Sequence, residues 1–220
     1  MENRETFFAR IQPFFAPSTI RDIELAYFIA KNGHRFQTRK ELDEEGNPKR
    51  YFEHLRGAAI NMMDVMKCMR SDTIIASLLH DCIEDTRDLT PEMIEHTFGG
   101  DICCIIKTVS KVPEEGYLER LHMCTDWRAL AVKACDNLNN QETLTTPGVY
   151  KSKEAHLAFV EKEINKTCAY YYPIFDKLLD IVPKEYLAGA TRLRDEIRKN
   201  VALNVRFLEQ SREKPKLGFY

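Results

Sequence analysis

The segment Leu79-His-Asp-Cys-Ile-Glu-Asp85 concentrates residues that could do chemistry. If it is helical, His80 and Glu84 lie four residues apart, as do Asp81 and Asp85, so the polar groups share one face. The apolar run 74–79 predicts that this helix is largely buried. Buried carboxylates beside an imidazole repel one another and lose hydration unless a cation neutralises them. An adjacent histidine and aspartate suit Mn²⁺, Zn²⁺ or Mg²⁺.

Two more residues could complete a metal site. His54 begins an amphipathic helical stretch, where a single histidine is more often structural. Asp136 lies in mostly apolar sequence, where an aspartate without a partner is costly, so a metal or another cation should meet it. Asn140 and Thr143 extend the same polar stripe. The alternatives are a salt-bridged aspartate at position 136 and, for the first segment, a solvated acidic helix end.

The elements that must position these residues have a helical pattern almost throughout. A helix with Ser18 as its N-cap should end at Gly33, and the charged segment 35–50 should form a loop around Gly46-Asn47-Pro48. Thr90-Pro91 marks another helix start, and Gly99-Gly100 its end. Further helices are predicted over residues 51–69, 71–81, 127–144, 153–177 and 184–211. No alternating strand pattern is visible, and the predicted fold class is all-α.

Composition excludes several classes of function. The net charge is −2 and the pI about 6.3, without the clustered basic residues of a nucleic-acid-binding protein. No apolar stretch is long enough for a membrane span, and the charged N-terminal residues do not resemble a signal peptide. None of the seven cysteines forms a Cys-x-x-Cys pair, so they are interpreted as buried thiols. We therefore expect a cytoplasmic protein without nucleic-acid or membrane partners.

The order of a histidine, a His-Asp pair and a distant aspartate over three helices resembles the ligand pattern of the HD phosphohydrolase superfamily. Leu78-Leu-His-Asp-Cys-Ile-Glu-Asp-Thr86 is similar to a signature of the RelA/SpoT family of (p)ppGpp hydrolases, the alarmone hydrolases of the stringent response. The resemblance covers roughly residues 20–180. Its other elements are Gln37-Thr-Arg-Lys40, Phe98-Gly, Val109-Ser-Lys111, Lys133 to Leu144 and Thr167 to Leu178.

The resemblance implies an HD-domain helical bundle that hydrolyses the 3′-pyrophosphate of (p)ppGpp to GDP or GTP and pyrophosphate. The implied ligands of Mn²⁺, or of another divalent ion, are His54, His80, Asp81 and Asp136. The implied catalytic pair, which positions and activates the attacking water, is Glu84 and Asp85. The implied nucleotide contacts are Arg39, which stacks on guanine, and Lys40, Asn140 and Thr143.

The chain departs from the family pattern at three positions near the last ligand. Asn137, Asn139 and Glu142 replace the family's Arg, His and Arg, and we expect them beside the substrate site. The loop between Lys40 and His54 is also longer than in typical members.

The expected organisation is an HD phosphohydrolase domain over residues 1–180 and a helical extension over 181–220 packed on the same domain. No synthetase domain fits in the remainder, which favours the small stand-alone hydrolases. The alternatives are an HD phosphatase for another nucleotide, such as NADPH (2′-phosphate) or ppApp, and a non-catalytic nucleotide sensor. The sensor should lack metal or water-activating positions, and none is missing here.

Overall fold

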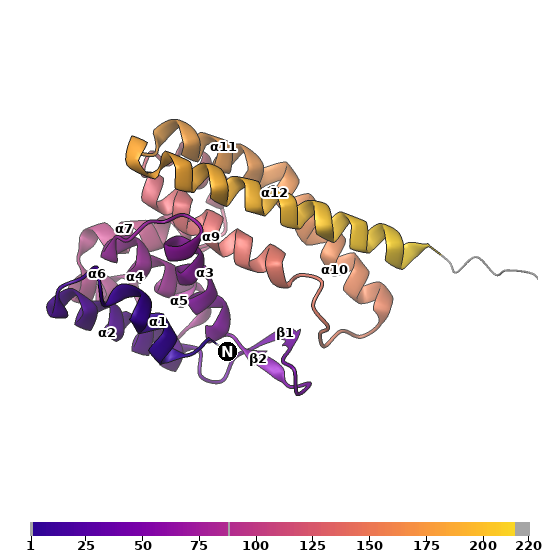
Figure 1. Ribbon diagram of the computed structural model, residues 1–220, viewed down its shortest axis with the longest axis horizontal. Coiled ribbons are helices and arrows are strands. Elements are labelled where there is room, and N and C mark those ends of the chain that lie inside the picture. The colour runs from indigo at the N-terminus through magenta and orange to yellow at the C-terminus, as the bar shows by residue number, and fades with distance from the viewer. Residues whose placement is uncertain (1, 88, 214–220) are drawn as a thin grey trace, which may run out of the picture.

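A computed structural model describes residues 2–87 and 89–213 of the chain. Helix α9 lies at the centre, with α3, α4 and α7 on one side and α11 and α12 on the other (Figure 1). The helices that precede α9 are α1 (Arg4–Ile11), α2 (Pro17–Gly33), α3 (Phe52–Asp64), α4 (Ser71–Leu79), α5 (Cys82–Asp85), α6 (Pro91–Phe98), α7 (Gly100–Val109) and α8 (Tyr117–Met123). The rest are α9 (Trp127–Thr143), α10 (Lys153–Lys166), the π-helix η1 (Thr167–Tyr171), α11 (Tyr172–Ile181) and α12 (Lys184–Arg212). The predicted all-α class is confirmed.

Helix starts follow local capping chemistry. The Thr90 side chain accepts a hydrogen bond from the Met93 amide, and a proline takes the first turn of α6, as the sequence predicted. Helix α2 instead begins at Pro17, and its N-cap is Ala16 rather than the predicted Ser18. A proline needs no amide partner in a first turn, so the helix starts there without a capping side chain.

Three predicted helices end or change earlier than expected. Helix α3 stops at Asp64 instead of residue 69, because Lys67 takes a left-handed backbone conformation with φ 56° and turns the chain. Helix α4 stops at Leu79, and α5 begins only at Cys82. The helix predicted over 153–177 is interrupted by the π-helix η1.

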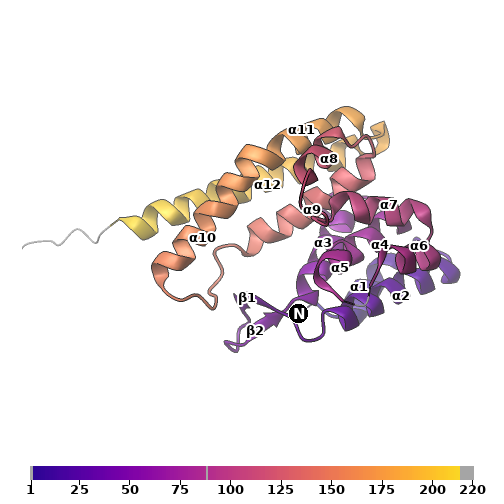
Figure 2. The same cartoon turned by 180° about the vertical axis from the view of Figure 1, so that it is seen from behind.

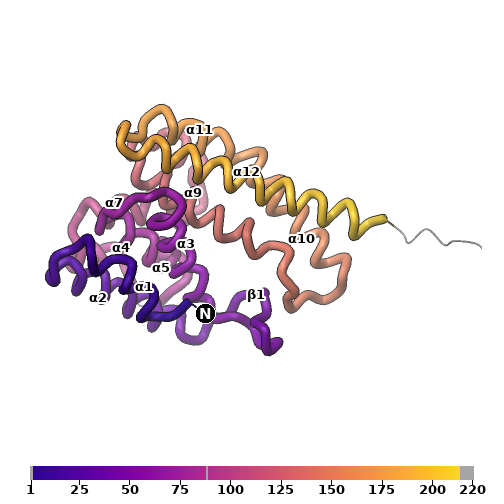
Figure 3. The backbone as a smooth tube through the Cα atoms, viewed as in Figure 1, coloured from indigo at the N-terminus to yellow at the C-terminus, as the bar shows by residue number. Residues whose placement is uncertain are grey.

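The segment predicted as a charged loop contains a β-hairpin. Strand β1 (Thr38–Leu42) pairs antiparallel with β2 (Pro48–Arg50), and the turn uses Gly46 at φ 84°. Residues 147–149 extend this pairing: the Leu42 amide donates to the Pro147 carbonyl over 2.8 Å. The hairpin projects beside the end of α9 (Figure 3), and Arg39 on β1 donates a hydrogen bond to Asn140 on that helix.

Helix α12 runs back along α10 and packs against α9 (Figure 2). The Asn204 amide donates hydrogen bonds to the backbone and side-chain oxygens of Gln141 on α9, at 2.9 and 3.0 Å. A Cβ at Gly189 would lie 1.8 Å from the Met66 carbonyl oxygen, so only glycine allows this approach. Within the described residues, no helix is both long and apolar enough to cross a membrane.

Candidate active site

Two histidines and two aspartates from three parts of the bundle meet in one buried cluster. His54 comes from α3, His80 and Asp81 from the break between α4 and α5, and Asp136 from α9. His54 Nε2 lies 3.1 Å from Asp136 Oδ1 and 3.7 Å from Asp81 Oδ2. His80 Nε2 lies 3.3 Å from Asp81 Oδ2 and 3.5 Å from Asp136 Oδ1. The structure therefore brings together all four residues that the sequence predicted as metal ligands.

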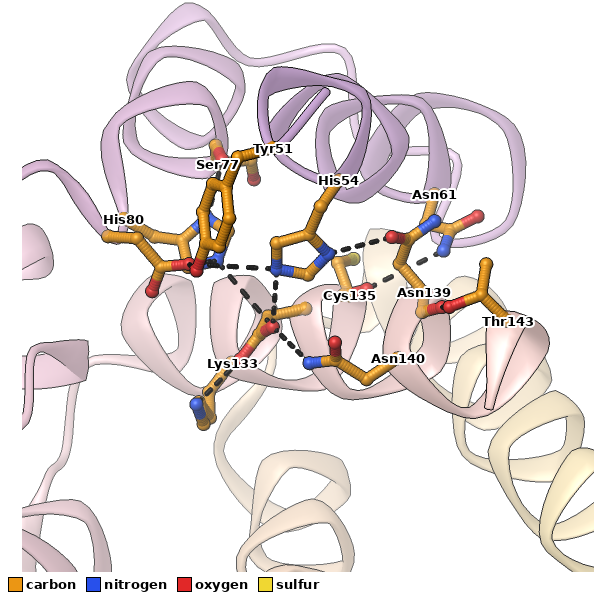
Figure 4. Close-up of polar contacts among 12 residues, drawn as sticks. Tyr51, His54, Asn61, Ser77, His80, Lys133, Cys135, Asn139, Asn140 and Thr143 are labelled. Atoms are coloured by element: carbon orange, nitrogen blue, oxygen red, sulfur yellow. Dashed lines mark hydrogen bonds and ion pairs between the residues drawn. The ribbon is translucent and has the colours of Figure 1, made fainter. Parts of the chain in front are cut away.

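Hydrogen bonds on the outer side of each imidazole fix its orientation. His54 Nδ1 donates to Asn139 Oδ1 over 2.7 Å, and His80 Nδ1 donates to the Ser77 carbonyl over 2.8 Å. Figure 4 shows the His54 ring extending from α3 toward α9, with Asn139 against its outer nitrogen. Both Nε2 atoms then point into the cluster, as they do in metal-binding histidines.

The cluster requires a positive charge. His80 Nε2 is buried and has no hydrogen-bond partner among the described residues. Burial alone would lower the pKa of His80, but the charges of Asp81 and Asp136 raise it to about 10. The two aspartates thus attract a cation between the rings. His54, His80 and Asp81 place donor atoms within 4.8 Å of one another, and Asp136 Oδ1 lies 3.1 and 3.5 Å from the two ring nitrogens. Such a set of nitrogen and oxygen donors fits a divalent metal ion.

Asp136 is held from both sides on its own helix. Lys133 Nζ donates to its Oδ2 over 2.6 Å, and Asn140 Nδ2 donates to its Oδ1 over 2.7 Å. Burial would raise the pKa of Asp136, but the Lys133 charge and the interactions with His54 and His80 together outweigh it and keep the pKa well below its ordinary value. Asp136 is therefore an ionised carboxylate in a fixed orientation.

Glu84 and Asp85 lie beside the cluster but not on the helical face that the sequence predicted. The helix breaks at His80-Asp81, so the two carboxylates belong to the short helix α5. An oxygen from each lies within 4.8 Å of an Asp81 carboxylate oxygen. The Glu84 carboxylate forms an ion pair with the Lys111 ammonium. It also accepts a hydrogen bond from the Lys111 backbone amide over 2.9 Å.

Tyr51 contacts both Asp81 and Asp85, and it was not among the site residues predicted from the sequence. Its hydroxyl lies 2.7 Å from Asp81 Oδ2 and 2.9 Å from Asp85 Oδ2. The ring stacks on the buried His34 imidazole, with centroids 4.9 Å apart. Burial and the charge of Asp81 raise the pKa of Asp85, although the Tyr51 hydrogen bond opposes this effect. The sequence feature that could have indicated this role is the position of Tyr51, three residues before His54.

A cavity of about 330 Å³ opens from the cluster, between the hairpin and α10. Its wall is rich in cationic and aromatic side chains. The lining residues are Thr38, Arg39, Lys40, Glu41, Tyr51, His54, Asp81, Lys111, Lys133, Asp136, Asn137, Asn140, Leu144, Phe159, Glu163, Lys166 and Tyr171. Three of the predicted nucleotide contacts, Arg39, Lys40 and Asn140, line this cavity. Thr143 does not, and neither do Glu84 and Asp85.

Arg39 is held rigidly at this wall. It makes two hydrogen bonds to the Glu41 carboxylate, at 3.0 and 3.1 Å, and one of 2.9 Å to Asn140 Oδ1. Thr143 donates to Glu41 Oε1 over 3.0 Å, so it supports Arg39 through Glu41. Because Asn140 also donates to Asp136, a continuous chain of hydrogen bonds joins Arg39 to the metal cluster.

The three departures from the family pattern occupy different places. Asn137 lines the cavity, as expected. Asn139 and Glu142 do not line it: Asn139 orients His54, and Glu142 accepts a hydrogen bond from Asn61 on α3 over 3.3 Å. Of the three residues predicted beside the substrate site, Asn137 reaches the cavity wall, whereas Asn139 and Glu142 face α3.

Apart from Lys40, the lysines in the cavity wall were not predicted from the sequence as site residues. Lys111 and Lys133 belong to the motifs that carry the resemblance, and Lys133 interrupts an apolar stretch, which was a usable signal. Lys166 and Phe159 stand on α10, where no local pattern indicates which face meets the cavity.

Comparisons with known proteins agree with this geometry. A family model described as HD domain matches residues 26–120. The chain is 30% identical over 176 residues to a GTP pyrophosphokinase of Streptomyces coelicolor, which is 76% of this chain and 19% of that protein. It is 34% identical over 137 residues to a guanosine-3′,5′-bis(diphosphate) 3′-pyrophosphohydrolase of Aquifex aeolicus, which is 58% of this chain and 18% of that protein. The chain thus spans about a fifth of the length of these curated relatives.

A solved structure has the same fold. It is described as a metazoan ortholog of SpoT that hydrolyzes ppGpp and plays a role in starvation responses. The TM-score is 0.60 at 21% identity, over 83% of this chain and 96% of that one. The curated relatives also include the bifunctional (p)ppGpp synthase/hydrolase SpoT of Escherichia coli, 27% identical over 146 residues, which is 61% of this chain and 20% of that protein. The predicted resemblance is therefore confirmed: the chain carries an HD domain, and its relatives by sequence are proteins of the RelA/SpoT family.

Proposed function

We propose that the protein is a metal-dependent hydrolase that removes the 3′-pyrophosphate of ppGpp or pppGpp. The observation that carries this proposal is the position of the His54, His80, Asp81 and Asp136 cluster at the floor of a cavity with cationic walls. The names of the curated relatives and of the similar structure support the same activity.

In this proposal His54, His80, Asp81 and Asp136 would hold Mn²⁺. When bound, such an ion supplies Lewis-acid activation of a water and neutralises phosphate charge. The protein orients the ligands in advance: Asn139 and Ser77 fix the imidazoles, and Lys133 and Asn140 fix Asp136.

Glu84 and Asp85 are the proposed water-activating pair. A carboxylate takes the proton of the attacking water while the water oxygen bonds to the phosphorus joined to the 3′ oxygen. The bond from that phosphorus to the 3′ oxygen breaks, the 3′ oxygen gains a proton, and GDP or GTP and pyrophosphate are released. Tyr51 positions Asp85 for this step, and Lys111 positions Glu84.

Arg39 is the proposed platform for guanine, and Lys40 and Asn140 are neighbouring nucleotide contacts. Glu41 holds the Arg39 guanidinium through two hydrogen bonds, which leaves a flat face that can stack on a base. Lys40 Nζ lies 3.9 Å from the centroid of the Phe159 ring, so it joins the hairpin to α10 across the cavity. Thr143 acts in this proposal through its bond to Glu41.

We propose the domain organisation given by the sequence: a catalytic domain over residues 1–180 and a C-terminal extension over 181–220. The packing of α12 on α9 supports an extension that docks on the same domain. Residues 214–220 of this extension lie outside the described residues. The proposed location is the cytoplasm, with a nucleotide rather than nucleic acid as the partner.

A substrate panel tests the activity. The purified protein is loaded with Mn²⁺, Mg²⁺ or Zn²⁺ and incubated with ppGpp, ppApp or NADPH, and pyrophosphate and orthophosphate are measured separately. We expect pyrophosphate from ppGpp, fastest with Mn²⁺. His80→Ala should lose both metal and turnover, whereas the matched control His96→Ala, on the distant helix α6, should keep both. Orthophosphate from NADPH without turnover of ppGpp would replace the proposed function with the phosphatase alternative.

A further inference from the structure

Several buried polar atoms of the described residues have no hydrogen-bond partner, and two of their residues, Asn137 and Tyr171, line the cavity. Among the residues that the structure describes, four buried side-chain atoms lack a hydrogen-bond partner: His80 Nε2, Tyr117 OH, Tyr171 OH and Asn137 Oδ1. The proposed metal accounts for His80. A buried hydroxyl without a partner costs stability, so such groups in a native protein require an explanation.

The two tyrosines enclose the Lys133 ammonium. Tyr117 stands at the start of α8, and Tyr171 ends the π-helix η1. Lys133 Nζ lies 5.8 Å from the centroid of the Tyr117 ring and 5.2 Å from that of Tyr171. All three residues are more than nine-tenths buried. Tyr171 and Lys133 line the main cavity, and Tyr117 lines an adjoining hollow of about 740 Å³ that Tyr171 also lines.

Lys133 is the buried cation whose charge is not balanced once a metal binds. In the described cavity wall, Arg39 pairs with Glu41 at 3.0 Å, and Lys111 pairs with Glu84. Lys133 pairs at 2.6 Å with Asp136, whose other oxygen faces the metal cluster. A divalent ion would share the charge of Asp136, and the ammonium would then need a further anion.

We propose that Lys133, Tyr117 and Tyr171 form a subsite for the terminal phosphate of a diphosphate group. This inference deepens the proposed function and rests on it. The phosphate joined to the 3′ oxygen lies at the metal cluster, and the second phosphate lies beside it, against the ammonium. The two hydroxyls donate hydrogen bonds to its oxygens, which gives both of them the partner they lack. The π-helix serves this subsite, because its extra residue places Tyr171 at the cavity wall.

The subsite separates substrates by the length of their phosphate group. A pyrophosphate reaches both the metal cluster and Lys133, whereas a single phosphate reaches only one of them. The enzyme should therefore prefer diphosphate groups over phosphomonoesters such as the 2′-phosphate of NADPH. Product pyrophosphate should bind in the same way and inhibit.

Removal of single hydroxyls gives a direct test. Tyr117→Phe, Tyr171→Phe and the double variant keep the rings and remove only atoms without partners, so folding should be unimpaired. Substitution of Lys133 is less informative, because it leaves Asp136 without its counter-charge. The matched control is Tyr172→Phe, one residue along the chain, where the ring packs on Arg198 and does not line the cavity. Binding of pyrophosphate and of orthophosphate to the Mn²⁺-loaded full chain is measured by titration calorimetry.

We expect each cavity variant to weaken pyrophosphate binding roughly 10-fold, the scale of one hydrogen bond to a charged group. Orthophosphate binding, Mn²⁺ content and the melting temperature without ligand should stay at their wild-type values, and Tyr172→Phe should match the wild type throughout. Unchanged pyrophosphate affinity in both variants would overturn the subsite, and so would an equal loss for both anions, since the hydroxyls would then face the phosphate at the metal. Failure to hydrolyse ppGpp with the expected binding pattern would reject the proposed function and leave the subsite standing.

Discussion

The bond between Asn139 and His54 gives a prediction that can be tested from two sides. Asn139→Ala removes the acceptor that fixes the His54 ring at 2.7 Å. Loss of such a partner lowers metal affinity by roughly 10- to 100-fold in other metal sites, about 1.4 to 2.8 kcal/mol. Isothermal titration of the apo-protein with Mn²⁺ measures this change directly.

Gly57 supplies the second perturbation, because it makes room for the Asn139 amide. A Cβ at position 57 would lie 2.3 Å from Asn139 Nδ2, whereas carbon contacts need roughly 3.5 Å. The amide must then move by about 1 Å, which takes the 2.7 Å bond to His54 out of hydrogen-bonding range. Gly57→Ala should therefore weaken Mn²⁺ binding by about the same factor as Asn139→Ala.

The double variant distinguishes this explanation from general damage. In Gly57→Ala/Asn139→Ala the clash is absent, so its affinity should equal that of Asn139→Ala alone instead of falling by the product of two losses. Gly100→Ala is the matched control, since its Cβ would meet only the end of Glu95 at 3.8 Å. Wild-type Mn²⁺ affinity in Asn139→Ala, or fully additive losses in the double variant, would refute the reasoning.

Three further predictions concern chemistry, binding and stability. Glu84→Gln and Asp85→Asn should retain Mn²⁺, measured by elemental analysis, but their single-turnover rates should fall roughly 10²-fold or more. Rates near those of the wild type would show that the pair does not activate the water. Arg39→Ala should raise KM for ppGpp far more than it lowers kcat, and a collapse of kcat alone would place Arg39 in the chemistry instead. Burial would raise the pKa of Asp72, but hydrogen bonds from two arginines hold it below 3.8. The ionised Asp72 thus stabilises the fold at pH values above the pKa that it has in the unfolded chain, and this stabilisation is lost as the pH falls. Below about pH 4, the free energy of unfolding in urea should therefore decrease less steeply with falling pH in Asp72→Asn than in the wild type. Equal slopes for the two proteins would contradict this.

The meeting of His80, Asp81 and Asp136 could be predicted from local signals, whereas His54 was predicted through the resemblance to a known family. A His-Asp pair after an apolar run and an aspartate inside an apolar helix are each costly without a cation, whatever the fold around them. The start of α6 was equally visible, since Thr90 and Pro91 act within one turn. Such features depend on neighbours in the sequence, so spacing alone was enough to find them.

The hairpin and the role of Asn139 depend on residues far apart in the chain. Strand β1 is highly charged and shows no alternation; it is stabilised by β2 and by residues 147–149, about a hundred residues later. What the Asn139 side chain contacts is decided by how closely α3 approaches α9, which Gly57 permits. Nothing near Asn139 in the sequence distinguishes an amide that orients a histidine from one that faces a substrate.

The cavity combines two parts of the chain, and this division bears on specificity. The HD match over residues 26–120 contains three of the four proposed ligands, whereas the opposite wall comes from α10 and η1, with Phe159, Lys166 and Tyr171. Contacts away from the reacting atoms decide which substrate reaches the transition state, and the metal cluster is indifferent to the rest of the nucleotide. Relatives that share the metal-binding half can therefore differ in substrate through this wall. In this chain, the wall places Lys166, Tyr171 and Phe159 across the cavity from Arg39, an arrangement that suits the proposed nucleotide substrate.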